Sequence, residues 1–105
     1  MAIPFVTIQL DRVYNIRFGM SAQVEFEQLT GISCIHILDN PSITIHAKVL
    51  WVMLKRDNKD LTLEQVTDLV DNYAESETYV IEKVNEAIFA AFPEVVEDDE
   101  EIKNS

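Results

Sequence analysis

Alternating apolar and polar positions near the start of the chain predict a β-hairpin. The alternation runs over 5–10 and again over 14–18, and a period of two is typical of half-buried strands. Residues that lie opposite each other in a hairpin share a face of the sheet. Pairing Leu10 with Tyr14 keeps the two apolar faces in step, and it predicts a three-residue loop over 11–13.

After Gly19 the apolar residues have the spacing of an α-helix. A first helix is predicted over 21–30, with Ser21 as its N-cap and Gly31 just beyond its C-terminus. The stretch over 32–43 is apolar but irregular, and it fits either a short helix or an irregular segment. The predicted buried stripe of the first helix consists of Ala22, Phe26 and Leu29.

A second helix is predicted over 42–56, and it is apolar nearly all round. A helix of this kind is usually central to a fold or lies in an oligomer interface. A third helix begins at Thr62, where Thr62 and Gln65 have the spacing of a capping box. Its predicted buried stripe consists of Val66, Leu69, Val70 and Tyr73.

A fourth helix is predicted over 76–92 and ends before Pro93. From 94 to 105 the chain has six acidic residues, one basic residue and no aromatic residue, which is typical of a disordered tail. The predicted fold class is therefore α+β: an N-terminal β-hairpin packed on a bundle of about four α-helices forms a single domain over 1–93, and a disordered acidic tail follows over 94–105.

The net charge of −11 excludes several classes of partner. Nucleic-acid phosphates need clustered Lys and Arg, and anionic membrane surfaces repel an acidic protein, so neither partner is expected. The longest apolar run, over 49–54, is too short to span a bilayer, and the first residues do not resemble a secretory leader. Cys34 is the only cysteine, so we expect a small buried residue in a protein of the reducing cytoplasm.

The residues that usually carry catalysis are sparse. His36 and His46 are the only histidines, and neither has a partner at a convincing metal-ligand spacing. The acidic loop over 57–60 fails as a calcium site because Lys59 and Leu61 occupy ligand positions and no glycine is present. The sequence predicts no cofactor, no metal and no enzyme activity, and it favours stoichiometric binding.

Three aromatic residues are the predicted protein-binding positions: Trp51, Phe89 and Phe92. Trp51 lies on the helix that is apolar all round, and this helix fits either a core or an oligomer face. Phe89 falls among polar residues of the fourth helix, where packing under the hairpin or tail and contact with a partner are both open. The sequence also leaves open whether the protein forms a homo-oligomer.

Two stretches of the chain resemble a known family. The first consists of Val6–Asp11, Tyr14–Met20 and Glu25–Gly31, and the second of Val49–Trp51, Asp60–Val66 and Asp68–Asp71. In order and spacing they resemble the small tail assembly chaperones of long-tailed phages and related prophages. The resemblance covers most of 5–75, and the chain departs from the family pattern between Ile32 and Ile45.

The resemblance implies a function in virus assembly. Proteins of this family bind the long, largely helical tape measure protein, keep it soluble and help to recruit tail tube subunits. They act in the host bacterial cytoplasm and are not expected in the mature virion. Some have a longer form made by translational frameshifting. The alternatives are a structural tail or tail-tube-associated virion subunit and, from a third class, a small hydrolase or metal-dependent enzyme.

Overall fold

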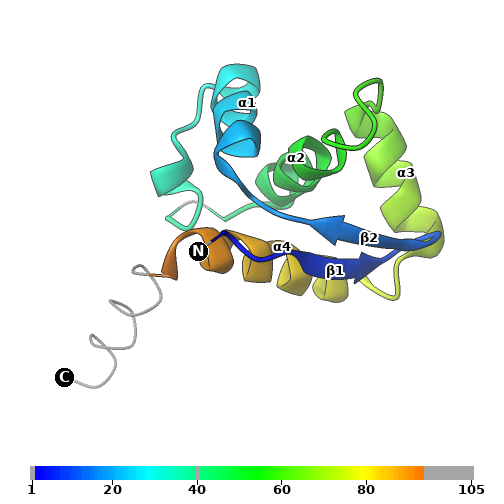
Figure 1. Ribbon diagram of the computed structural model, residues 1–105. Coiled ribbons are helices and arrows are strands. Elements are labelled where there is room, and N and C mark those ends of the chain that lie inside the picture. Colours follow the sequence, from blue (N-terminus) through cyan, green and yellow to red (C-terminus); the bar gives the residue numbers. More distant parts are fainter. Residues whose placement is uncertain (1, 40, 94–105) are drawn as a thin grey trace.

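The computed structural model describes residues 2–39 and 41–93, and it shows a two-stranded antiparallel hairpin followed by four α-helices (Figure 1). This confirms the predicted α+β class. The predicted acidic tail over 94–105 lies outside the described residues. The elements are β1 (Val6–Gln9), β2 (Val13–Ile16), α1 (Met20–Thr30), a short 3₁₀ helix (Cys34–His36), α2 (Ile43–Leu54), α3 (Leu63–Tyr73) and α4 (Glu77–Ala91).

The predicted faces of the hairpin are confirmed, but its predicted register is wrong by two residues. Ile8, not Leu10, lies opposite Tyr14, and the three-residue loop is 10–12. A slip of two residues keeps every side chain on its face, so alternation alone cannot detect it. The loop is closed by the Leu10 backbone N–H, which donates to the Arg12 carbonyl at 2.9 Å. The Tyr14 hydroxyl also donates to Asp11 Oδ1 at 2.7 Å.

Helix α2 occupies the centre of the fold (Figure 1). It contacts α1, α3, α4 and β2, so most of its faces have a neighbour. This explains why it is apolar nearly all round, and it favours the core interpretation of that helix over the oligomer interpretation. Its buried side chains are His46, Val49, Leu50, Val52, Met53 and Leu54.

The hairpin is held against the helices by packing and by one hydrogen bond. A two-stranded sheet is at best marginally stable alone. Here β1 lies along α4, where the Gln9 backbone N–H donates to the Tyr79 hydroxyl at 2.9 Å. Beyond β2, the fully buried Phe18 ring meets Phe26 edge-on at 6.3 Å and Phe92 at 6.4 Å between ring centroids. The Phe18 cluster therefore joins the hairpin to α1 and to the end of α4.

The helix termini follow the sequence signals at three of four N-termini. Ser42, Thr62 and Ser76 each accept a hydrogen bond from a backbone N–H three residues later, and the Thr62–Gln65 capping box is complete. Ser21 is not an N-cap, because α1 begins one residue earlier behind Gly19. Gly31 ends α1 at a φ of 71°, a left-handed conformation that favours glycine.

Two residues of the predicted buried stripes are exposed. Leu29 is 48% exposed at the end of α1, and Tyr73 is 58% exposed at the end of α3. Both lie in the last turn of a helix, where the partner helix no longer covers the stripe. Residues Ala22, Phe26 and Val66 of the same stripes are buried as predicted.

The Thr62 cap makes a testable contribution to stability. Thr62→Ala removes the acceptor for the Gln65 backbone N–H, which is 3.1 Å away, and we expect the free energy of unfolding to fall by about 1 kcal/mol. Urea unfolding followed by circular dichroism measures the change. Thr44→Ala is the matched control, because Thr44 is exposed in the first turn of α2 and caps nothing. An equal loss in both variants would contradict the capping interpretation.

Candidate protein-binding groove

Helices α2, α3 and α4 surround a mostly apolar hollow. Both α3 and α4 pack on α2 but make little contact with each other, so a groove remains between them. We call it the α2–α3–α4 groove. It is lined by Ile43, His46, Ala47, Leu50, Val66, Thr67, Val70, Asp71, Glu77, Val80 and Ile81.

The size of this groove indicates what it accommodates. Its volume is about 100 Å³ and it is open to solvent, whereas pockets for drug-sized ligands usually measure about 300–1,000 Å³. The groove is therefore suited to single side chains presented by another protein. Ile43 stands at its edge and is 60% exposed, so an apolar side chain is already available for contact.

The floor of the groove is fixed by His46, a buried polar residue. Its Nδ1–H donates to the Ser42 carbonyl at 2.9 Å, and its Nε2 lies 2.9 Å from the side-chain oxygen of Asn85. These contacts tie the start of α2 to the middle of α4. His46 therefore acts here as a structural link between α2 and α4, two walls of the groove.

The rim of the groove is acidic. Asp71 on α3 and Glu77 at the start of α4 are exposed and flank the apolar lining, and no Lys or Arg is among the lining residues. An apolar surface with this rim is complementary to an amphipathic helix that has basic flanking residues.

None of the three aromatic residues predicted from the sequence lines the groove. Trp51 is half-buried on α2, and its indole N–H donates to the Leu61 carbonyl at 2.8 Å. Lys55 Nζ lies 4.9 Å from the centroid of the same ring. Trp51 therefore supports the α2–α3 connection, and only part of its ring remains accessible to a partner.

Phe89 and Phe92 lie in and just after the last turns of α4. Phe92 packs on the core through Phe18, whereas Phe89 is half-buried. Figure 1 shows this end of α4 on the opposite side of the molecule from α3. Trp51 contacts Leu61, which lies just before α3. The structure thus does not bring Trp51 together with the two phenylalanines, and their predicted binding of a partner remains a prediction.

The sequence held a partial signal for the groove. Ile43, Ala47 and Leu50 have the spacing of one helix face, and so do Val66 and Val70. These positions read as ordinary core stripes, because helical periodicity does not show that two neighbouring helices diverge.

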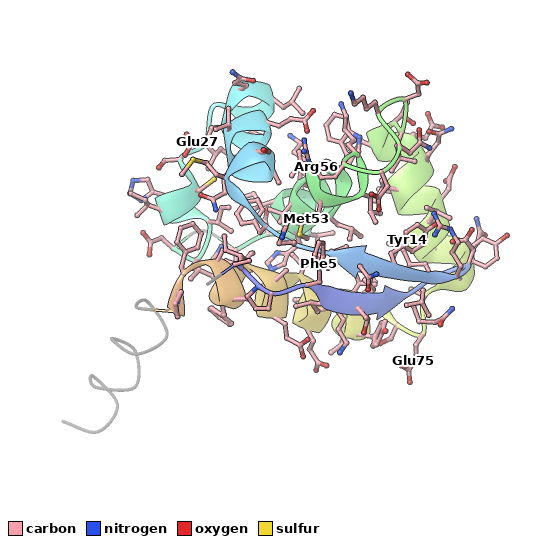
Figure 2. All side chains as sticks on the ribbon, viewed as in Figure 1. Phe5, Tyr14, Glu27, Met53, Arg56 and Glu75 are labelled. Carbon is pink, nitrogen blue, oxygen red and sulfur yellow. The ribbon has the colours of Figure 1, made fainter. Side chains whose placement is uncertain are left out.

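Outside the groove, two kinds of chemistry are relevant: the thiol of Cys34 and side chains that could bind a metal ion. Cys34 is buried as predicted, with its backbone N–H donating to Glu27 Oε2 at 2.8 Å, and Figure 2 labels Glu27 on α1. Burial and the neighbouring Glu27 carboxylate raise the pKa of the Cys34 thiol to about 12. Over residues 2–39 and 41–93, no group of three or more His, Cys, Asp or Glu side chains is placed to hold a metal ion.

No protein-family model, curated protein sequence or solved structure matches this chain. Within the described residues, none of the helices has the length and apolar character needed to cross a membrane.

The raised pKa of Cys34 predicts slow thiol chemistry. The thiolate is the reactive form, and a pKa near 12 leaves Cys34 protonated at pH 8. We expect a disulfide reagent to react with the native chain at least about a hundredfold more slowly than with the urea-unfolded chain. The pKa of the Cys34 thiol is higher in the folded chain than its ordinary value of 9.0. The contribution of this thiol to the free energy of unfolding therefore decreases as the pH rises above 9.0. Equal reaction rates in the two states would contradict the assignment.

Proposed function

We propose that this protein is a tail assembly chaperone of a long-tailed phage or prophage that acts by stoichiometric binding. In this proposal it binds the tape measure protein in the host bacterial cytoplasm, keeps it soluble and helps to recruit tail tube subunits. It is absent from the mature virion, and it catalyses no reaction.

The observation that carries the proposal is the apolar α2–α3–α4 groove with its acidic rim. A tape measure protein exposes apolar helical surface until the tail tube encloses it. The groove is suited to the side chains of such a helix, and Asp71 and Glu77 favour a helix with basic flanks. The residues that resemble the chaperone family, including Val49–Trp51 and Asp60–Val66, belong to the helices and the connection that build this region.

The net charge of −11 also suits a protein that holds an aggregation-prone partner. High net charge of one sign keeps a complex soluble and opposes self-association. The charge does not prevent partner binding, because the lining of the groove itself is mostly apolar.

Co-expression with the tape measure protein from the same genome tests the proposal. We expect the tape measure protein to become soluble and to elute with this chain in gel filtration. Unchanged solubility and separate elution would overturn the proposal. Mass spectrometry of purified particles separates it from the virion-subunit alternative, because an assembly factor is missing from particles. Gene order is a further check, since we expect this gene between the tail tube gene and a very long tape measure gene.

A variant of the groove edge tests the binding surface itself. Ile43→Glu places a charge where an apolar contact is expected, and fully burying an isoleucine is worth about 1.5–3 kcal/mol. We therefore expect the Kd for the tape measure protein to rise by about tenfold or more. Titration calorimetry or surface plasmon resonance measures this change.

The chain offers a matched control at Ile35. It is 77% exposed in the 3₁₀ helix and does not line the groove. Ile35→Glu makes the same chemical change and should leave the Kd unaltered. Both variants are expected to fold, since neither isoleucine is buried. If the two variants weaken binding equally, the partner does not occupy the α2–α3–α4 groove.

A further inference from the structure

A second groove, lined by α1, the C-terminal end of α2, β2 and the N-terminal segment, has more cations than carboxylates in its lining. It consists of two hollows, of about 440 and 310 Å³, that share Ser21 and Arg56 in their linings. We call it the α1–α2 groove. Figure 2 labels Phe5, Met53 and Arg56, all three of which line the larger hollow.

Cations are concentrated in the α1–α2 groove. Four of the eight Lys and Arg residues of this acidic chain line it, against two carboxylates. One carboxylate, Glu25, already pairs with Lys55 at 3.2 Å. The four cations are Arg17, Lys55, Arg56 and Lys59.

Apolar side chains stand beside these cations. Met20 is 77% exposed, Phe5 is 58% exposed and Val24 is 49% exposed. All three line the α1–α2 groove. A surface that combines exposed cations with exposed apolar side chains is complementary to an acidic peptide that also has apolar residues.

The C-terminal residues of the chain have this composition and lie next in sequence to Phe92 and Pro93. Residues 94–105 combine six acids with Val95, Val96 and Ile102. We propose that this C-terminal segment binds in the α1–α2 groove of its own chain, with its acids facing the cations and its apolar residues covering Met20 and Val24. The proposal does not depend on the proposed chaperone function.

The connection between groove and segment favours binding within one chain. The Phe92 ring packs on Phe18, which directly precedes Gly19 and Met20 at the edge of the groove. The segment therefore begins close to its binding site, and twelve extended residues span roughly 40 Å, enough to follow the groove. Such a short tether gives a high effective concentration, which offsets the weakness of individual exposed ion pairs.

Paramagnetic relaxation in the full chain tests the proposal. A nitroxide label is attached to a Ser105→Cys variant, and the wild-type chain carried through the same labelling shows whether Cys34 reacts. We expect the label to broaden the backbone amide signals of Met20 and Val24. We also expect the broadening to be lost in about 1 M salt, where the Debye length is about 3 Å.

Two charge-reversal pairs sharpen the test. Arg56→Glu combined with Lys59→Glu removes two exposed cations from the groove, and the broadening at Met20 and Val24 should disappear. Lys48→Glu combined with Lys83→Glu makes the same change in net charge outside the groove, and the broadening should remain. The dispersion of the amide spectrum verifies that each variant is folded.

Three results would overturn the proposal. The first is the absence of broadening at Met20 and Val24 in the otherwise wild-type chain. The second is equal broadening in the two charge-reversal variants. The third comes from a mixture of two samples: isotope-enriched chains without a spin label, and spin-labelled chains without isotope enrichment. Full broadening in this mixture would show that the groove binds the C-terminal segment of a second copy.

Discussion

The burial of α2 among several elements at once is the constraint on which the rest of this structure depends. Residues Val49, Leu50 and Val52 are fully buried on successive faces of one helix, so no single partner element can cover it. Helices α1, α3 and α4 and the hairpin divide that surface among them. Burying an aliphatic side chain contributes about 1.5–3 kcal/mol, so α2 is expected to supply a large part of the stability of the domain.

The same constraint explains why grooves form where they do. Elements that all pack on one central helix do not also have to pack on each other, and α3 and α4 diverge above α2. The α2–α3–α4 groove is apolar with an acidic rim, whereas the α1–α2 groove at the other end of the helix is lined by cations. The two grooves therefore suit different partners, and α2 contributes residues to both.

The proposed function rests on these two groove surfaces and on the family resemblance, since no family model, curated protein or solved structure matches the chain. A chaperone for an extended helical protein needs an accessible apolar surface that does not cause its own aggregation. A small groove within an acidic surface meets both needs. Two of the three aromatic residues predicted to bind a partner also make internal contacts: Trp51 donates a hydrogen bond to the Leu61 carbonyl, and Phe92 packs on Phe18.

The sequence by itself determined the class of fold, the faces of the hairpin and most helix ends, because period and capping are local properties. The capping box at Thr62 and the glycine at Gly31 are examples. It did not determine the hairpin register, because a shift of two residues preserves the alternation, nor the exposure of Leu29, because burial depends on where the neighbouring helix ends. The α2–α3–α4 groove was decided only by the tertiary structure. Periodicity identifies the apolar face of each helix, but the angles between helices determine whether those faces meet or leave a space.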